Sequence, residues 1–284
     1  MIIVSPKKPF YPKQLERLHS PPQQLYIESA NWESIVSMPM LAVVGTRRPS
    51  SYATHECGRI VRELAGRGVC IVGGLALGID GIAHRAALEA GGVTIAVLPA
   101  GLNNICPSSH RQLAKDIVAC GGALITEHPP QSAIAYKGNF IARNRIVAGL
   151  SAAVFIPEAA EKSGSLHTAQ FAIESGIDVC AMPGQISNPQ STGCHHLIQA
   201  GAALVINSDD IANIMGIAAH PHSTNVVVAS AEEARILQCI ASGIHDANEL
   251  QIACKLPITQ FQQTLSMLEI SGKIKAGGGN SWYI

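Results

Sequence analysis

The sequence predicts an α/β protein with a doubly wound, mostly parallel sheet, followed by a small C-terminal winged-helix domain. From Met40 to about Met215, short β-forming apolar runs alternate with runs whose apolar residues recur at helical spacing, which is typical of βαβ units and a parallel sheet. A glycine follows most of the helical runs, where helices commonly end. Near the end of the chain, three helical runs precede two short β-forming segments, the pattern of a winged helix.

The elements of the sheet domain follow one another in a regular order. The predicted strands are Leu41–Gly45, Val69–Gly73, Val93–Leu98, Ala123–Thr126, Ala152–Ile156, Asp178–Ala181 and Ala203–Ile206. The predicted helices are Tyr52–Arg67, Gly78–Ala90, Ser109–Cys120, Ala142–Leu150, Gly164–Ser175 and His195–Ala200. Glycines that end most of these helices are Gly68, Gly91, Gly121, Gly176 and Gly201. We therefore expect helices on both faces of the sheet.

The chain divides into four predicted regions. An N-terminal strap covers residues 1–39, the sheet domain 40–216, a linker 217–230 and the winged-helix domain 231–284. The strap contains prolines that break regular structure, so we expect it to lie irregularly against the sheet edge. The linker is recognised by its histidine, proline, serine and asparagine content.

The winged-helix domain is predicted from Glu232–Ile240, Ala247–Ala253 and Thr259–Ile270, followed by a hairpin around Gly277, Gly278 and Gly279. Its would-be recognition helix contains no lysine or arginine between Thr259 and Met267. This composition makes a role in reading duplex DNA doubtful, and a protein-contact or packing module stays open because a fold does not assign a function.

Composition places the chain among globular proteins. With 284 residues, 47% hydrophobic and 14% charged, it can bury one large core and still form a small second domain. No apolar run approaches the roughly 20 residues that span a bilayer, and the first residues lack a signal peptide, so we expect a cytoplasmic protein. The eight cysteines form no C-x-x-C pair and are interpreted as small core residues. Neither a metal nor a cofactor is expected, since adjacent Cys194, His195 and His196 point in different directions.

A group of loops at the predicted strand ends suggests a site for a polyanion. These loops are Val44–Arg48, Gly73–Gly78, Lys137–Arg145 and Ser163–Ser165. Glycines offer backbone N–H groups to phosphate oxygens, arginines stand beside them, and ligands of open α/β sheets gather outside the carboxyl ends of the strands. Because the formal net charge is zero, any such site must depend on local charge.

Each loop allows a functional and a structural interpretation. Arg47 can meet a phosphate together with the following helix N-terminus, or it can pair with a carboxylate. Phe140 lies between Lys137 and Arg143, which suits a stacked base of a single strand but also a plug in the core. Ser163 to Ser165 can form an anion cradle or a helix N-cap.

Several enzyme classes lack their motifs. Gly73 to Gly78 does not have the G-x-G-x-x-G spacing of dinucleotide binders, and no Gly-Lys-Ser/Thr of a P-loop occurs. A nucleophile elbow is also missing. Asp80 and His84 lie four residues apart on one helix face and can act as acid and base, although such pairs are more often surface or capping contacts.

The same motifs resemble the DprA/Smf family of bacterial DNA-processing proteins, across residues 11–210 and more weakly in the winged helix. The resemblance depends on motifs in the right order: Tyr11-Pro12, Pro22-x-x-Leu25-Tyr26, Val44-Gly45-Thr46-Arg47, Gly74 to His84, Arg143 to Ser151, Ser163 to Ala169 and Pro183-Gly184. It implies an extended Rossmann-like domain that binds single-stranded DNA in a positive pocket, forms a homodimer and loads RecA during natural transformation.

The resemblance also implies roles for individual residues. It assigns the phosphate-contacting arginine to Arg47, the pocket lysine to Lys137 and the base-stacking phenylalanine to Phe140. Together with the residues of the four loops, this gives the expected DNA contacts Gly45, Thr46, Arg47, Gly74, Lys137, Phe140, Arg143, Asn144, Arg145, Ser163, Gly164 and Ser165. No catalytic residue is expected.

The sequence departs from the family pattern at a few places. Gly73 replaces a usual serine, Ile141 a common proline and Ala142 a common arginine, and the helical N-terminal domain of many members has no counterpart. Two alternatives stay open. One is a nucleotide phosphoribohydrolase, although its Pro-Gly-Gly-x-Gly-Thr loop is missing and Glu158 or Glu174 would have to supply the carboxylate. The other is a protein scaffold that uses the winged helix.

Overall fold

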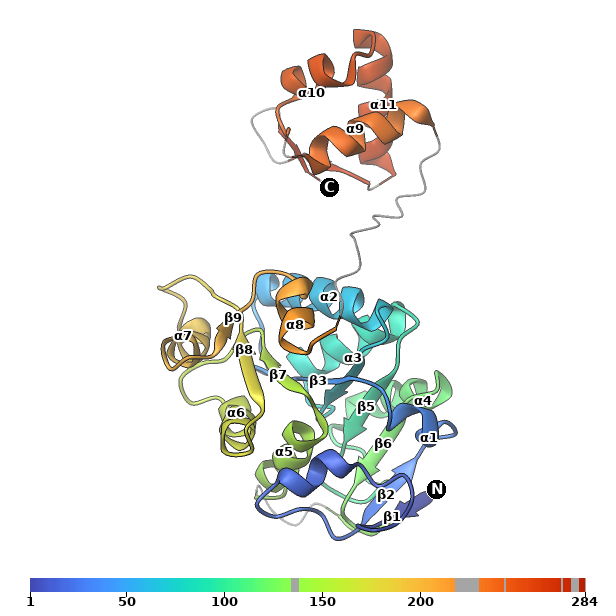
Figure 1. Cartoon of the computed structure of the whole chain (residues 1–284), viewed down its shortest axis with the longest axis vertical. Helices are drawn as coiled ribbons and strands as arrows, with labels where there is room; N and C mark the ends of the chain where they lie inside the picture. The colour runs from blue at the N-terminus through green and yellow to red at the C-terminus, as the bar shows by residue number, and fades with distance from the viewer. Residues whose placement is uncertain (134–137, 218–229, 243, 272, 277–280, 284) are drawn as a thin grey trace. The chain divides into compact units, whose positions relative to one another are not determined.

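The computed structural model describes the whole chain except residues 134–137, 218–229, 243, 272, 277–280 and 284 (Figure 1). It forms two compact units, Met1–Ala219 and His220–Ile284. The first unit contains the sheet domain together with the N-terminal segment. The second contains the winged helix.

A nine-stranded sheet organises the described part of the first unit, with the strand order β1-β2-β6-β5-β4-β3-β7-β8-β9. Seven of its strands are parallel to one another. They are β3 (Met40–Val43), β4 (Cys70–Gly73), β5 (Thr94–Val97), β6 (Ala123–Thr126), β7 (Ala153–Ile156), β8 (Asp178–Ala181) and β9 (Ala203–Leu204). The predicted doubly wound, mostly parallel sheet is therefore confirmed.

The order in which the strands are added to the sheet reverses at β3. From β3 the chain adds strands on one side as far as β6, and it then returns to place β7, β8 and β9 on the other side. β3 therefore has β4 and β7 as its two neighbours. Such a switch point opens a crevice outside the carboxyl ends of the strands, because the loops there diverge to opposite faces.

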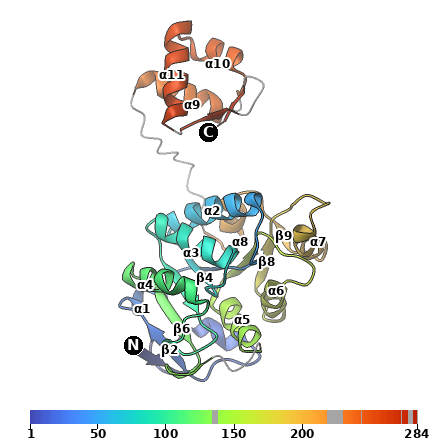
Figure 2. The same ribbon diagram turned by 180° about the vertical axis from the view of Figure 1, so that it is seen from behind.

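Helices cover both faces of the sheet (Figures 1 and 2). One face carries α2 (Ser51–Gly66), α3 (Ile79–Glu89), α4 (Arg111–Ala119) and α8 (Ser208–Ile214). The other carries α5 (Gly138–Leu150), α6 (Ser165–Glu174) and α7 (Thr192–Gln199). Alternate residues of β3 enter the two cores, Leu41 and Val43 on the first face and Met40 and Ala42 on the second, as the two-residue period of a strand requires.

The N-terminal segment is more regular than its prolines predict. β1 (Ile2–Val4) pairs antiparallel with β2 (Leu25–Glu28), and β2 pairs antiparallel with β6, so the segment extends the sheet. Between and after these strands lie η1 (Lys13–Arg17) and α1 (Trp32–Ile35). Trp32 and Leu15 are fully buried in the core on the α5 side. The prolines lie outside the strands, where they cost no ladder hydrogen bond.

α5 begins at Gly138, four residues before the sequence pattern predicts a helix. Phe140 therefore lies in the first turn of a helix rather than in a loop. The C-terminal part of the helix, from Ile146 to Leu150, is apolar and buried, and Arg17 of η1 donates to the carbonyl oxygens of Gly149 and Ser151 at this end. These hydrogen bonds hold the C-terminal end of α5, the helix that also carries Phe140.

The second unit forms the predicted winged helix. Its helices are α9 (Ala231–Ala241), α10 (Ala247–Cys254) and α11 (Ile258–Ile270), and its wing pairs β10 (Lys275–Ala276) antiparallel with β11 (Trp282–Tyr283). Ser230 and Asp246 cap α9 and α10 with their side chains. Ile236, Leu250 and Leu268 are buried in a small core of the unit's own. The glycine triplet at 277–279 lies outside the described residues.

Within the described part of the chain, each helix is too short or too polar to span a bilayer.

Candidate nucleic-acid interface

A cleft of about 800 Å³ lies at the switch point, outside the carboxyl ends of β3 and β7. The loop after β3 forms one wall, and the start of α5 and the turn before α6 form the other walls. The lining residues are Val44, Gly45, Thr46, Arg47, Ala76, Asp80, Phe140, Ile141, Arg143, Asn144, Ala160, Lys162, Ser163, Gly164, Ser165, His167 and Thr168. The cleft thus joins segments that lie far apart in the sequence.

Most of the site residues expected from the sequence line this cleft. Those that do are Gly45, Thr46, Arg47, Phe140, Arg143, Asn144, Ser163, Gly164 and Ser165. Gly74 and Arg145 do not line it. Lys137 lies outside the described residues, so its place relative to the cleft stays a prediction.

Arg47 and Phe140 lie side by side in the lining of the cleft. Arg47 is exposed, and its Cζ atom lies 5.9 Å from the centroid of the half-buried Phe140 ring. This spacing allows a cation–π contact. Because the ring lines the cleft and is partly accessible, Phe140 does not serve as the core plug that the sequence left open. It offers a flat surface beside a positive charge.

The turn before α6 adds a second positive element. Lys162 is exposed and lines the cleft next to Ser163, whose hydroxyl lies 2.8 Å from that of Ser165. α6 starts at Ser165, so the positive end of its helix dipole lies at the cleft. Neither Arg47 nor Lys162 pairs with a carboxylate of the described residues. These two cations and the helix end favour an anion.

Sequence reasoning missed Lys162 as a site residue. The available signal was its position directly before the Ser-Gly-Ser turn, where a lysine can bring its ammonium group close to a helix N-terminus.

Arg143 lines the cleft but is only 5% exposed. Its guanidinium donates to the carbonyl oxygens of Gly74, at 2.6 Å, and of Val97. It therefore ties α5 to the ends of β4 and β5. Burial lowers the pKa of Arg143 to about 10, which leaves the side chain protonated at neutral pH. Its hydrogen bonds to the protein show a structural role.

The presence of Arg143 explains why position 74 is a glycine. A Cβ atom at position 74 would overlap the Arg143 guanidinium, so a side chain has no space there. The N–H group of Gly74 donates to the Asp80 carboxylate at 2.8 Å. Burial raises the pKa of Asp80, while the positive charge of Arg143 lowers it. The glycine thus makes room for Arg143, and its N–H is engaged by Asp80. A contact between Gly74 and DNA stays a prediction.

Arg145 faces away from the cleft and pairs with Glu127 at 2.6 Å. Both side chains are largely buried, with 15% and 20% exposure. The pair connects α5 to the end of β6, so in this structure Arg145 is a structural residue and not part of the cleft wall.

The start of α2 is already occupied by a carboxylate. Glu158 is buried and accepts from the backbone N–H of Ser50 at 2.8 Å and from its hydroxyl at 2.7 Å. Asn188 donates to the same carboxylate at 3.3 Å. A phosphate shared between Arg47 and this helix end, as the sequence suggested, would meet the negative charge of Glu158. Both carboxylate oxygens of Glu158 thus accept hydrogen bonds within the protein.

Asp80 and His84 do not form an acid–base pair. His84 is fully buried, and its Nδ1 atom lies 2.7 Å from the Thr94 hydroxyl. That hydroxyl donates to the carbonyl oxygen of Ile71, so it accepts a hydrogen bond from Nδ1–H of His84. The Nε2 atom has no hydrogen-bond partner among the described residues. Burial lowers the pKa of His84 to about 3.

We expect His84 to make the fold acid-sensitive. An unfolded chain binds a proton at this histidine below pH 6.5, whereas the folded chain does so only near pH 3, so the free energy of unfolding falls as the pH decreases between these values. The loss reaches about 2 kcal/mol at pH 5. Urea denaturation at pH 7 and pH 5 measures it. His84→Asn keeps a donor for Thr94 and does not titrate, so its loss should be smaller; equal losses in both proteins would contradict the assignment.

No group of three or more His, Cys, Asp or Glu side chains gathers as possible metal ligands among the described residues. Cys194 is buried, His195 contacts the backbone of Gly184, and His196 is exposed.

Comparison with known proteins decides the family. The family model described as DNA recombination-mediator protein A matches residues 2–216, and the DprA winged helix domain matches residues 220–280. The chain belongs to the DprA family. The resemblance seen in the sequence motifs is thereby confirmed, and the cleft lies within the part that the first model matches.

Relatives in this family cover most of the chain. Protein Smf of Escherichia coli is 48% identical over 204 residues, which are 71% of this chain and 53% of that protein. DNA processing protein DprA of Streptococcus pneumoniae is 40% identical over 201 residues, 71% of this chain and 70% of that protein. The match thus spans about half the length of the E. coli relative.

Two solved structures of DprA proteins are similar to this one. The X-ray structure of DprA from S. pneumoniae has a TM-score of 0.70 and 36% identity, and it covers 77% of this chain and 75% of that one. A DprA structure from Helicobacter pylori, described for its single-stranded DNA binding mode, has a TM-score of 0.66 and 32% identity, covering 74% and 94%. The sheet domain therefore has the DprA fold.

Proposed function

We propose that this chain binds single-stranded DNA in the switch-point cleft, by its phosphates and by one stacked base, with little sequence preference. The observation that carries the proposal is the exposed guanidinium of Arg47 beside the accessible Phe140 ring, in a cleft that Lys162 also lines. The H. pylori relative, whose structure is described for single-stranded DNA binding, supports it.

Phosphates would lie along the cationic side of the cleft. Arg47 supplies one charge, and Lys162 with the start of α6 supplies a second position. On a chain with no net charge, this local field attracts the strand without a basic surface elsewhere. Affinity should decrease steeply with salt, because each neutralised phosphate releases counterions.

Replacement of Phe140 tests the stacking. Phe140→Ala should lower the affinity for an oligothymidine by about tenfold, since a base stacked on an aromatic ring contributes roughly 1–3 kcal/mol. Phe140→Tyr keeps the ring and should retain most of the affinity, whereas Phe140→Leu keeps an apolar side chain of similar size and should behave like alanine. Fluorescence anisotropy of a labelled oligonucleotide measures all of these proteins. Wild-type affinity in Phe140→Leu would contradict stacking.

Competition with duplex DNA tests strand selectivity. Bases in a duplex are already stacked on one another, so they cannot lie on Phe140 without unpairing. An unlabelled duplex should therefore compete poorly with the labelled single strand. Equal competition by duplex and single strand would indicate that the cleft binds only the phosphate backbone and stacks no base.

A non-enzymatic role fits the chemistry of the cleft better than hydrolysis. Asp80, a carboxylate that lines the cleft, is buried and accepts from Gly74, and Glu158 accepts from Ser50 and Asn188. Neither is placed to activate a water molecule for attack on a nucleotide. The phosphoribohydrolase alternative predicts release of the free base from a nucleoside monophosphate, which chromatography of the products would detect.

The resemblance to DprA/Smf proteins extends the proposal to partners. We propose that the chain forms a homodimer through its Rossmann-like domain and loads RecA onto incoming single strands during natural transformation, in the cytoplasm. Light scattering after size-exclusion chromatography tests the dimer. RecA filament formation on strands covered by single-strand binding protein, with and without this chain, tests loading. A scaffold that acts through its winged helix would instead keep its function when Arg47 is replaced.

A further inference from the structure

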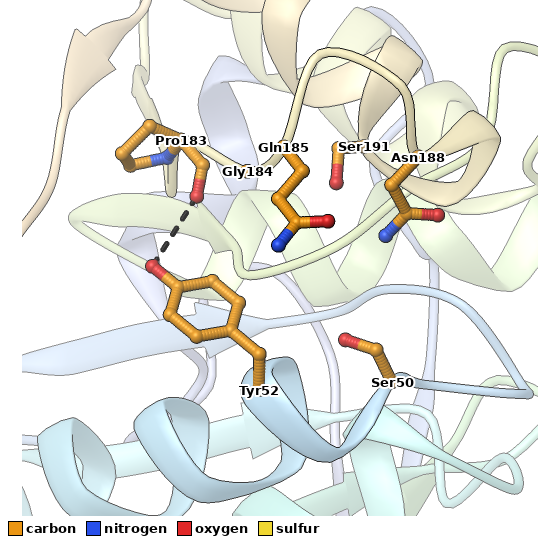
Figure 3. Close-up of a pocket in the computed structure, with 7 residues that line it drawn as sticks. All are labelled: Ser50, Tyr52, Pro183, Gly184, Gln185, Asn188 and Ser191. Atoms are coloured by element: carbon orange, nitrogen blue, oxygen red, sulfur yellow. Dashed lines mark hydrogen bonds between the residues drawn. The ribbon is translucent and has the colours of Figure 1, made fainter.

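A second cavity, of about 570 Å³, lies beside the cleft at the carboxyl ends of β3 and β8. Figure 3 shows Ser50 and Tyr52, from the start of α2, on one side of it, and the loop from Pro183 to Ser191 on the other. Its lining residues are Ser50, Tyr52, Pro183, Gly184, Gln185, Asn188 and Ser191. None of the DNA contacts expected from the sequence lies here.

The cavity has an unused polar group of its own. Ser191 is only 4% exposed, it lines the cavity, and its hydroxyl forms no hydrogen bond with another described residue. A largely buried hydroxyl without a protein partner is open to a ligand that hydrogen-bonds it. The hydroxyl lies against the Cα of Gly184, where a Cβ atom would overlap it, so a side chain at position 184 would displace Ser191.

The lining carries no charged residue, and its surroundings disfavour an anion. The carboxylate of Glu158 accepts from Ser50 and Asn188, two of the lining residues, and it occupies the start of α2. A phosphate placed there would be repelled, in contrast to one placed near Arg47 and Lys162. The chemistry of the cavity therefore suits a neutral ligand with donors and acceptors.

The ring of Tyr52 and the amide of Gln185 favour a planar ligand. The ring of Tyr52 is half exposed and is held by a hydrogen bond of 3.3 Å from its hydroxyl to the carbonyl oxygen of Pro183. Gln185 is exposed, and its amide group points toward the space between the loop and α2 (Figure 3). A planar ligand can stack on Tyr52 while its edge meets the amide and the Ser191 hydroxyl.

We propose that this cavity binds a nucleobase, stacked on Tyr52 and hydrogen-bonded by Ser191 and Gln185. Nucleobases are neutral and planar, and they carry donors and acceptors on their edges. The volume accommodates one base with its sugar. The cavity adjoins the cleft, because the hydroxyl of Thr46, which lines the cleft, donates to Gln190, the neighbour of Ser191, at 3.3 Å.

The base can belong to a strand that leaves the cleft or to a free nucleoside. The first source rests on the proposed function, and the second does not. An oligonucleotide with a single photoreactive 5-iodouracil at successive positions distinguishes them, because the activated base joins to an aromatic ring that it touches. Peptide mapping should find Tyr52 joined at one position and Phe140 at another. Joining at Phe140 but never at Tyr52 would exclude the strand as the source.

Substitutions give an independent measurement. Tyr52→Ala and Ser191→Ala should each weaken the binding of an oligothymidine of about 15 nucleotides measurably, by up to about tenfold. The affinity for an oligothymidine of about 4 nucleotides should stay unchanged. Tyr52→Phe keeps the ring and is the matched control. Arg47→Ala should weaken both lengths alike, which separates a failure of this cavity from a failure of the cleft. Equal affinity of wild type and Tyr52→Ala for both lengths would overturn binding of a strand base.

Free thymidine and adenosine complete the test, with saturation-transfer NMR as the readout. Binding that disappears in Tyr52→Ala and Ser191→Ala, without joining of an oligonucleotide to Tyr52, assigns the cavity to a free nucleoside. The proposal is overturned if neither nucleosides nor oligonucleotides respond to these two substitutions. Should the wild type bind no oligonucleotide at all, the proposed function fails and the nucleoside experiment alone decides the cavity.

Discussion

Replacing Arg47 with alanine should reduce the affinity for single-stranded oligothymidine by at least about tenfold at low salt, whatever the sequence of the strand. The guanidinium lines the cleft, lies near the Phe140 ring and pairs with no carboxylate of the described residues, so its charge is free for a phosphate. Anisotropy titrations at two salt concentrations measure both the affinity and its salt dependence. The negative slope of log affinity against log salt should become less steep by about 0.7 for each phosphate that the variant no longer neutralises.

Arg48 supplies the matched control for this prediction. It is the next residue in the same loop and is also exposed, but it does not line the cleft. Arg48→Ala removes the same formal charge and should change the affinity only slightly. If both variants bind equally weakly, general charge and not the cleft holds the strand. If both bind like the wild type, the scaffold or the small-nucleotide enzyme becomes the better hypothesis.

Replacing Arg143 should destabilise the sheet domain strongly, whatever it does to DNA binding. Arg143→Met keeps an apolar side chain of similar length but leaves the carbonyl oxygens of Gly74 and Val97 without their donor, and it removes the positive charge that acts most strongly on the buried Asp80. Breaking a buried charge arrangement of this kind costs about 3–5 kcal/mol. Urea denaturation, monitored by far-UV circular dichroism, measures the decrease in the free energy of unfolding of the sheet domain.

A double substitution separates charge from hydrogen bonding at this position. Asp80→Asn removes the negative charge that Arg143→Met leaves behind, so the double variant should recover part of the stability, as a double-mutant cycle reports. Arg145→Met, which breaks the pair with Glu127, should cost less because that pair, at 15% and 20% exposure, is less buried than Arg143 at 5%. Wild-type stability in Arg143→Met together with weakened DNA binding would show instead that Arg143 contacts the ligand.

The parallel sheet was predictable because its signals are local. Apolar strands, amphipathic helices and the glycines that end them repeat along the chain, and the rule that ligands gather at the carboxyl ends of such strands brought Arg47, Phe140 and Ser163 to one place. The strands of the N-terminal segment escaped prediction, since their pairing with each other and with β6 joins residues distant in sequence. Prolines beside those strands also made the segment look irregular.

The sequence by itself determined the fold class, the family and the edge of the sheet where the site lies, because residue type, spacing and order express these properties directly. Tertiary structure alone decided what each charged residue does there. Arg47 and Arg143 are the same residue type, each in a motif that borders the cleft, yet one is exposed there and the other is buried against Gly74. Burial and hydrogen-bond partners depend on residues from distant strands, and so they become visible only when the chain is folded.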